Sequence, residues 1–361
     1  MENKEHKFPY KWTLKDANFT KDKGKVFSCF ACGGGSTMGY KLAGYDVIGC
    51  NEIDPAMNLC YVTNHNPKFN FLCDIKDMIT KVDLPNDLYN LDILDGSPPC
   101  STFSTTGLRE KTWGKRKKFR EGQKEQILDT LFFDFIALAK RLQPKIVVAE
   151  NVKGLILGEA MKYVRKIYNE FDNAGYYCQH FLLNASRMGV PQKRERVFFI
   201  CLRKDLALPF LERVNMFEET PKIKMDFNEK PILFSEFYIP NLDDRPAGKG
   251  KMFEYWSKRK LGDKLFIDTV IREYGISKCF SNTYLYKDQV CNTMTSNSDC
   301  IYLFDEYRKP NKIESACIST FPQDYDFCNS QYSYVEGMSV PPVMMAQISS
   351  RIYEQWLSKL K

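Results

Sequence analysis

Cys100 is the residue of this sequence best placed for chemistry. It follows two consecutive prolines and the apolar run 91–94, which predicts a buried strand, and the prolines fix φ and keep the backbone extended. A cysteine on a rigid turn beyond the carboxyl end of a strand lies where open α/β sheets place their reactive groups. Free cysteines are more often small buried hydrophobic residues. The prolines before Cys100 and the polar Ser101 and Thr102 after it favour a displayed, nucleophilic thiol instead.

A second group of reactive side chains follows farther along the chain. Residues 145–149 predict a buried strand that delivers Glu150 at its carboxyl end, where it can act as a general acid or, alternatively, cap the next helix. Gln192, Arg194 and Arg196 lead into another apolar run, 197–201. Alternate residues of a strand share a face, so we expect these three side chains to project together. Two guanidinium groups on one face seldom serve packing.

The first strand–turn–helix unit has the features of a nucleoside pocket. A strand is expected over 26–30, three glycines follow at 33–35, and a helix runs from about 36 to 44. Glycines let backbone approach a ligand at a helix N-terminus, although the full G-x-G-x-x-G spacing is absent. After the second predicted strand, 47–51, Glu52 can accept hydrogen bonds from ribose hydroxyls, Ile53 can lie on adenine, and Asp74 can accept from its amino group. Each acid alone is more often a surface residue.

The cysteines and histidines do not predict a metal site. Cys29 and Cys32 form a C-x-x-C pattern, which elsewhere indicates redox chemistry or zinc. No second pair lies at ligand spacing, and the three histidines, His6, His65 and His180, are scattered. We therefore expect no metal.

Residues 101–122 form a polar, basic segment directly after Cys100. The net charge of +7 is modest for 361 residues, so the clustering of charge matters more than its total. A charge run is usually a solvated face, but beside a candidate nucleophile we favour contact with nucleic acid phosphates. The basic residues of the segment are Arg109, Lys111, Lys115, Arg116, Lys117, Lys118 and Arg120, with Trp113 and Phe119 between them.

The length of 361 residues suggests one large domain or one large and one small domain, and the composition indicates a cytoplasmic protein. Thirteen cysteines without a framework spacing, and no signal peptide, favour a reducing compartment. No apolar run is long enough to span a membrane. Helices are expected over 123–142, ending before Pro144, and over 160–171, with a strand over 178–183.

The alternation of strands and helices predicts an α/β fold with a doubly wound sheet. It is lost from about 205 to 300, where we expect a smaller domain of short mixed strands, and order returns in a C-terminal helix ending near 360. The predicted division is an N-terminal extension (1–24), a large α/β domain (25–204), a smaller domain (205–330) and a C-terminal segment that returns to the large domain (331–361).

Four motifs, in this order, resemble those of the cytosine-C5 DNA methyltransferases of bacterial or phage restriction-modification systems. They are Ser97-Pro98-Pro99-Cys100, Glu150-Asn151-Val152, Gln192-x-Arg194-x-Arg196 and Gly337-x-Ser339-Val340-Pro341. The resemblance spans roughly 26–204 and 291–357. It implies a Rossmann-like, S-adenosylmethionine-dependent methyltransferase sheet, with a target recognition domain that faces it across a DNA cleft.

The resemblance also implies residue roles. Cys100 matches the nucleophile that adds to C6 of a flipped cytosine, Glu150 the acid at N3, and Arg194 and Arg196 the arginines near the base. We expect Arg194 to hold O2 and Arg196 to position either Glu150 or the loop. Expected cofactor contacts are Phe30, Ala31, Gly34, Gly35, Glu52, Ile53, Asp74, Ile75, Pro98, Leu131, Ser339 and Val340. Expected DNA contacts are Ser101, Ser104, Arg109, Lys115, Arg116, Lys117, Lys118, Gln192, Thr293 and Thr295.

Further motifs match, and two positions depart from the family pattern. Thr293-Met294-Thr295 looks like the family's Thr-Leu element, and Arg308 with Glu314 looks like the structural motif that follows it. Cys32 stands where the family usually has a glycine, and Met338 where it has an asparagine. The expected partner is double-stranded DNA, bound by a monomer in the cytoplasm and at the nucleoid. Any cognate restriction endonuclease is expected to act separately.

Other functions fit the sequence less well. Methylation of cytosine in tRNA shares the chemistry, but a recognition region of about 95 residues favours duplex DNA. A zinc deaminase lacks its ligands, and a nicotinamide dehydrogenase explains neither Cys100 nor the arginines. A non-catalytic DNA-binding relative would have lost the catalytic residues, whereas Cys100, Glu150, Arg194 and Arg196 are all present.

Overall fold

The computed structural model describes residues 6–99, 130–215, 218–244, 248–276, 282–296 and 300–360. The chain divides into two compact units. The first, called the sheet unit below, comprises residues 18–184, 195–226 and 345–361; the second, the mixed unit, comprises 1–17, 185–194 and 227–344. These bounds differ from the predicted domains, since residues 205–226 belong to the sheet unit. The functional names given to the predicted domains stay predictions.

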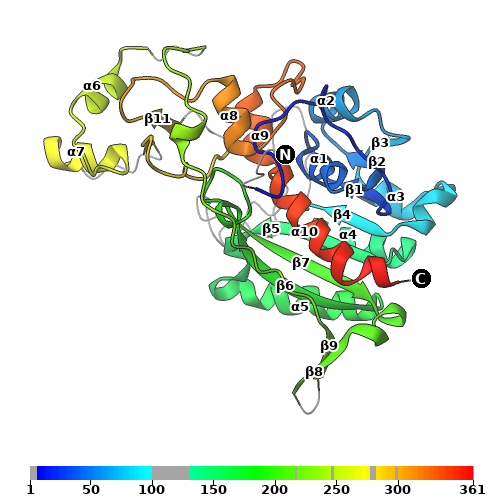
Figure 1. Cartoon of the computed structure of the whole chain (residues 1–361). Helices are drawn as coiled ribbons and strands as arrows, with labels where there is room; N and C mark the ends of the chain where they lie inside the picture. The colour runs from blue at the N-terminus through cyan, green and yellow to red at the C-terminus, as the bar shows by residue number, and fades with distance from the viewer. Residues whose placement is uncertain are drawn as a thin grey trace. The chain divides into compact units, whose positions relative to one another are not determined.

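A seven-stranded sheet of order β3-β2-β1-β4-β5-β7-β6 forms the sheet unit (Figure 1). Its strands are β1 (Lys25–Cys29), β2 (Asp46–Glu52), β3 (Phe69–Leu72), β4 (Ile93–Gly96), β5 (Ile146–Val152), β6 (Tyr176–Asn184) and β7 (Glu195–Arg203). Only β7 runs against its neighbours, pairing antiparallel with both β5 and β6. The strand order reverses between β1 and β4, which is where doubly wound sheets open a crevice for ligands. The predicted α/β sheet is confirmed.

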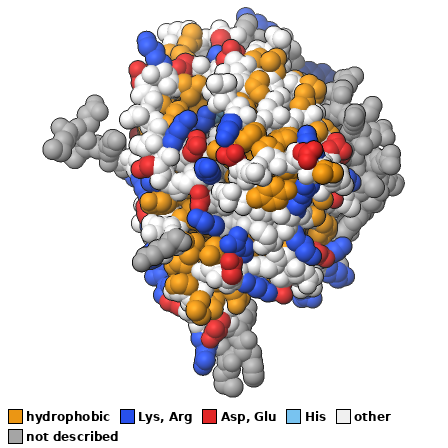
Figure 2. All heavy atoms as spheres, turned by 90° about the vertical axis from the view of Figure 1, so that its right-hand side faces the viewer, with side chains coloured by type: hydrophobic (Ala, Val, Ile, Leu, Met, Phe, Trp, Pro, Cys, Tyr) orange, Lys and Arg blue, Asp and Glu red, His pale blue; other side chains and the backbone are white. Residues whose placement is uncertain are grey.

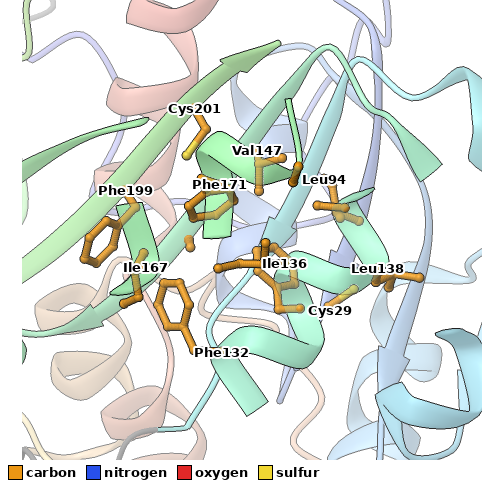
Figure 3. Packing of buried hydrophobic residues seen from close by; sticks show 14 of the residues in the cluster. Cys29, Leu94, Phe132, Ile136, Leu138, Val147, Ile167, Phe171, Phe199 and Cys201 are labelled. Carbon is orange, nitrogen blue, oxygen red and sulfur yellow. The ribbon is translucent and has the colours of Figure 1, made fainter. Parts of the chain in front are cut away.

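One face of the sheet is covered by α3 (Ile75–Thr80), α4 (Leu131–Leu142) and α5 (Met161–Asn173). Figure 3 shows side chains of α4 and α5, among them Phe132 and Ile167, packed with Val147 and Phe199 of the sheet. The helix predicted over 123–142 is described from Leu131 on. Its Leu131, Phe135 and Leu138 are buried, and it ends at Gln143, whose φ of 51° breaks it before Pro144. Apolar burial at helical spacing therefore builds this half of the core.

The other face carries α1 (Gly35–Leu42) and α2 (Pro55–His65). Asp95 of β4 points to this face and is 1% exposed. Its Oδ2 accepts a hydrogen bond from Ser28 Oγ of β1 at 2.9 Å, and its Oδ1 accepts one from Tyr40 OH of α1 at 3.3 Å. A buried carboxyl group thus ties α1 to the two central strands.

The remaining elements of the sheet unit are the hairpin of β8 (Leu211–Asn215) and β9 (Glu218–Pro221) and the C-terminal part of α10 (Pro342–Gln355). Tyr45 OH donates to Ser349 O of α10 at 2.9 Å, and Trp356 Nε1 donates to Lys222 O at 2.8 Å. These two hydrogen bonds join the C-terminal residues 345–356 to parts of the sheet unit that are distant in the sequence. None of the helices in the described parts of the chain has the length and apolarity that crossing a bilayer requires.

The mixed unit contains α6 (Lys251–Ser257), α7 (Phe266–Tyr274), α8 (Lys312–Ser319), α9 (Tyr332–Met338) and a two-stranded parallel sheet of β10 (Thr283–Leu285) and β11 (Ile301–Leu303). The predicted loss of strand–helix alternation is confirmed here. Arg308 and Glu314 form a buried bidentate pair, with Nη1–Oε2 and Nη2–Oε1 distances of 2.7 and 2.9 Å. This pair agrees with the structural motif expected at these residues.

Replacing Asp95 with asparagine should change how stability depends on pH. Burial, with a smaller contribution from Glu150, raises the pKa of the Asp95 carboxyl to about 7, although the hydrogen bonds from Ser28 and Tyr40 oppose the shift. The folded chain therefore holds this proton where the unfolded chain has lost it, so stability from this group is complete below pH 4 and falls as the pH rises to about 7. The wild type should lose on the order of 2 kcal/mol more than Asp95→Asn between pH 5 and pH 8. Urea unfolding of both proteins at the two pH values measures this difference, and equal losses would contradict the assignment.

Candidate active site

The carboxyl ends of β1, β2 and β3 bring the first group of predicted site residues together. Ala31 N, after β1, donates to Asn51 O of β2 at 3.1 Å, and Cys73 N, after β3, donates to Glu52 O at 3.1 Å. The turns after three neighbouring strands are thus bonded side by side. The expected cofactor residues on these turns share one edge of the sheet: Phe30, Ala31, Gly34, Gly35, Glu52, Ile53, Asp74 and Ile75.

The glycine turn between β1 and α1 needs left-handed backbone at three positions. Phe30, Cys32 and Gly34 have φ values of 52°, 48° and 90°. Glycine adopts this conformation freely, whereas a residue with a Cβ pays about 1 kcal/mol. Cys32 therefore occupies a backbone position suited to the glycine that the family usually has there. The turn keeps its left-handed shape despite the side chain.

Glu52 is a buried carboxylate that holds the glycine turn. Its Oε2 accepts from Cys32 N at 2.7 Å, and its Oε1 accepts from Ile53 N at 2.8 Å and Asp54 N at 2.9 Å. Burial raises the pKa of Glu52, while these three amide donors act in the opposite direction. A carboxylate has about four acceptor positions, so one position remains for a ligand hydroxyl. Glu52 can shape the pocket and contact its occupant at once.

Three of the expected cofactor residues also have structural roles. Asp74 is the N-cap of α3, where its Oδ1 accepts from Lys76 N at 3.0 Å. Ile75 and Leu131 are each 2% exposed and belong to the hydrophobic cluster under the sheet. These contacts hold the first residues of α3 and α4 in place against the sheet.

The turn after β4 starts from a tightly packed glycine. A Cβ on Gly96 would lie 2.5 Å from the ring of Phe135, so only glycine lets α4 approach this closely. Asn151 Nδ2 then donates to Pro98 O at 3.1 Å, while Asn151 Oδ1 accepts from Val152 N at 2.9 Å. The sequence assigned no role to Asn151. The one indication in the sequence was a polar asparagine at the end of a predicted buried strand. Its hydrogen-bond partner, Pro98 O, is 53 residues away and could not be predicted.

Glu150 and Arg196 form an ion pair at the same edge. Arg196 Nε lies 2.9 Å from Glu150 Oε1, and the two side chains are 17% and 12% exposed. The pair arises because β5 and β7 are antiparallel: Val152 at the end of β5 lies opposite Arg196 near the start of β7. The expected contact between Arg196 and Glu150 is present. The guanidinium fixes the direction of the carboxylate.

The expectation that Gln192 and Arg194 share a strand face with Arg196 is wrong. β7 begins at Glu195, and Gln192 and Arg194 precede it in the mixed unit. Arg194 is 2% exposed and donates through Nη1 to Met294 O at 2.6 Å and through Nη2 to Gly337 O and Ser339 O at 3.0 Å. In this structure its guanidinium binds three backbone carbonyls. It therefore joins two segments of the mixed unit.

Gln192 has a similar joining role. It is 1% exposed, its Nε2 donates to Ile318 O at 3.0 Å, and its Oε1 accepts from Met294 N at 3.1 Å. Both ends of the amide are thus engaged by protein backbone, and the expected DNA contact of Gln192 stays a prediction. Thr293 Oγ1 donates to Lys193 O at 2.7 Å, so the Thr293-Met294-Thr295 segment is bonded to residue 193 as well as to Gln192 and Arg194.

The Gly337 motif packs on this segment within the mixed unit. A Cβ on Gly337 would lie 2.0 Å from Thr295 O, so the close approach requires glycine. Ser339 and Val340 are buried, with exposed fractions of 5% and 4%, whereas Thr295 is exposed. The expected cofactor role of Ser339 and Val340 and the expected DNA role of Thr293 and Thr295 stay predictions.

Several predicted site residues lie outside the described residues: Cys100, Ser101, Ser104, Arg109, Lys115, Arg116, Lys117 and Lys118. Their roles also stay predictions. Across the described ranges, no three His, Cys, Asp or Glu side chains gather as metal ligands would.

A hollow of about 500 Å³ opens at the opposite edge of the sheet, by the amino ends of β1, β4 and β5. Its charged lining is paired, for example Lys145 Nζ with Asp92 Oδ1 at 2.7 Å. The candidate site is therefore the carboxyl edge, where the predicted site residues of the sheet unit lie.

Comparisons with known proteins agree with this arrangement. The chain is 36% identical over 188 residues to the Type II methyltransferase M.FnuDI of Fusobacterium nucleatum, covering 52% of this chain and 49% of that protein. It thus spans about half the length of that relative. It is 25% identical over 360 residues to the Type II methyltransferase M.NgoFVII of Neisseria gonorrhoeae, covering 94% and 89% of the two chains. The crystal structure of a Spodoptera frugiperda DNMT2 mutant has the same fold, with a TM-score of 0.61, 18% identity and coverage of 91% and 99%.

A family-wide comparison covers nearly the whole chain. Residues 24–354 match the C-5 cytosine-specific DNA methylase family, and this range contains all four motifs on which the resemblance rests. The range also includes most of both compact units and every strand of the large sheet. The chain therefore belongs to the C-5 cytosine-specific DNA methylase family.

Proposed function

We propose that this protein is a DNA (cytosine-5-)-methyltransferase that acts on a specific site in double-stranded DNA. The observation that carries the proposal is the Glu150–Arg196 pair at the end of β5. The next residue of β5, Asn151, donates to Pro98 O in the segment that leads to Cys100. An oriented carboxyl group and a nucleophilic cysteine are what activation of a cytosine ring requires. Membership of the family agrees with this chemistry.

The carboxyl edge fits S-adenosylmethionine. A left-handed glycine turn gives backbone access at the N-terminus of α1, and the buried Glu52 keeps one acceptor position for a ribose hydroxyl. Ile53 and Phe30, both partly exposed at this edge, offer apolar contact for adenine. When bound, this cofactor supplies a methyl group on a positively charged sulfur.

The chain's own residues then make the pyrimidine reactive. The Cys100 thiolate adds to C6 while Glu150 donates a proton or hydrogen bond to N3, which makes C5 a carbon nucleophile. After C5 has gained the methyl group and lost its proton, elimination returns the thiolate to Cys100. Arg196 positions Glu150, and because Arg194 binds three carbonyls, we assign it a positioning role and favour Arg196 as the arginine nearest the base.

The substrate base must leave the helix to reach this edge. Flipping a base costs a few kcal/mol, which contacts elsewhere must offset. We propose that residues 101–122 contact phosphates and that the 205–330 region reads bases. We further propose a monomer that acts in the bacterial cytoplasm and at the nucleoid, with any cognate endonuclease acting as a separate protein.

Replacing the proposed nucleophile should abolish methylation but not DNA binding. Bisulfite sequencing of DNA from cells that express the wild type should show 5-methylcytosine in one sequence context, and Cys100→Ala should show none because no adduct can form. Cys300→Ala is the matched control and should methylate normally. Retained turnover by Cys100→Ala, or transfer to tRNA with none to duplex DNA, would overturn the proposal.

Breaking the Glu150–Arg196 pair should slow the chemical step. Glu150→Gln removes the acid and should lower kcat about 100- to 10,000-fold, while Arg196→Ala should lower it about 100-fold because the carboxylate loses its orientation. Single-turnover methylation with saturating cofactor and DNA measures this effect. Arg203→Ala, at the other end of β7 in its own ion pair with Asp205, is the control and should leave the rate within twofold. A similar loss of rate in Arg203→Ala would mean that disturbing β7, and not breaking the Glu150–Arg196 pair, slows the reaction.

Glu52→Gln should weaken cofactor binding. The amide would face Cys32 N with one fewer acceptor, so the turn loses a charge-assisted hydrogen bond and the dissociation constant for S-adenosylmethionine should rise about 10- to 100-fold. Isothermal titration calorimetry measures this constant. Asp46→Asn, at the amino end of the same strand, should bind the cofactor as the wild type does, and unchanged binding by Glu52→Gln would remove Glu52 from the site.

A further inference from the structure

A short turn between α6 and α7 of the mixed unit displays apolar and basic side chains together. We call residues 258–264 the basic turn; its position between the two helices is visible in Figure 1. Leu261 at its tip is 87% exposed, and Lys258, Lys260 and Lys264 around it are exposed as well. Single exposed leucines are common, so exposure alone carries little weight.

The backbone of the basic turn is held rigidly from one side by Asp263. This aspartate is 8% exposed, and its Oδ2 accepts from Lys260 N at 2.9 Å and from Thr269 Oγ1 at 2.7 Å, while its Oδ1 accepts from Arg272 Nη1 at 2.5 Å. The tip leucine therefore stands on a turn closed across its base by one carboxylate.

A tyrosine and an arginine hold the turn from the other side. Tyr286 OH accepts from Gly262 N at 3.2 Å and donates to Asp263 O at 2.7 Å. The Arg259 guanidinium lies 3.3 Å from the ring centroid of Trp256 and donates to Trp256 O at 2.9 Å. Arg259 thus packs at the base of the turn, whereas the three lysines are exposed around the tip. Because the turn that displays the leucine is already ordered, binding a partner would cost less conformational entropy there.

Charge decides the kind of partner that suits this turn. Residues 249–264 carry six basic and two acidic side chains, a net charge of +4, against +7 for the whole chain. On the face drawn in Figure 2, by contrast, basic and acidic side chains are interspersed. Lys260 Nζ is 3.9 Å from Glu273, and both groups are exposed enough for a phosphate to compete for the lysine. An apolar tip surrounded by lysines matches a nucleic acid duplex, where phosphates flank base and sugar edges.

We propose that the basic turn is a DNA-contacting element, in which Lys258, Lys260 and Lys264 bind phosphates and Leu261 packs against a base step or sugar in a groove. The inference rests on the proposed function, because it takes the partner to be duplex DNA. It adds a surface that the four family motifs do not contain. The lysines set affinity and its salt dependence, and the leucine adds an apolar contact that salt does not weaken.

The test measures binding of the full chain to a fluorescein-labelled 30-base-pair duplex of mixed sequence by fluorescence anisotropy, between 50 and 200 mM salt. The triple variant Lys258→Ala, Lys260→Ala, Lys264→Ala should bind about 10- to 100-fold more weakly, with a salt slope smaller by about 2 to 3. Leu261→Ser should bind about 3- to 10-fold more weakly with an unchanged slope. All replaced side chains are exposed, so thermal unfolding midpoints should match the wild type.

Matched controls come from the sheet unit. Lys162→Ala, Arg165→Ala, Lys166→Ala removes three exposed cations from α5, and Leu208→Ser replaces a leucine that is 79% exposed. Both should bind within twofold of the wild type. If the basic-turn variants bind as these controls do while the wild type binds and methylates DNA, the inference fails and the proposed function stands.

Two other results would also overturn the inference. A basic-turn variant that changes the sedimentation coefficient of the protein alone, with DNA affinity intact, would make the turn an interface between copies of this chain. A wild type that neither binds nor methylates duplex DNA would remove the proposed function and this inference together.

Discussion

The direction of one strand decides where the candidate site can form. Because β7 runs antiparallel between β5 and β6, its first residues lie at the edge where the parallel strands end. An arginine at the start of β7 can therefore reach a glutamate at the end of β5, as Arg196 and Glu150 do. A parallel strand in that place would carry the same arginine to the opposite edge. Glu150 would then lack the ion pair that orients its carboxylate.

The same edge shows what sequence patterns can and cannot predict. Strands such as β1 and β5 were predictable because their apolar runs are continuous and short, as buried parallel strands require. The shared face of Gln192 and Arg194 was not, since alternation applies only inside a strand and β7 starts at Glu195. Their partners, among them Met294 and Gly337, are 100 or more residues away in the sequence. No local pattern reports contacts of that range.

The two arginines of one motif consequently do different work. Arg194 belongs to the mixed unit and binds three backbone carbonyls, whereas Arg196 belongs to the sheet unit and pairs with Glu150. The chain passes from one unit to the other between them. A guanidinium with five donors can satisfy several carbonyls at once, which suits the residue that ends a segment of the mixed unit. Two residues later, the same side chain serves to orient a carboxylate.

Asp95 shows that the charge of the site depends on residues behind it. It lies in β4 on the strand that leads to Cys100, and its partners Ser28 and Tyr40 are 67 and 55 residues away, so its burial was not predictable. Burial raises the pKa of Asp95 to about 7, and Glu150 contributes to the shift. Below that pH, the Asp95 carboxyl is neutral, so β4 adds no second negative charge to that of Glu150. Above it, a buried carboxylate in β4 would repel Glu150, so burial and Glu150 both favour the protonated form of Asp95. The hydrogen bonds of Asp95 to Ser28 and Tyr40 meanwhile hold α1 to the two central strands of the sheet.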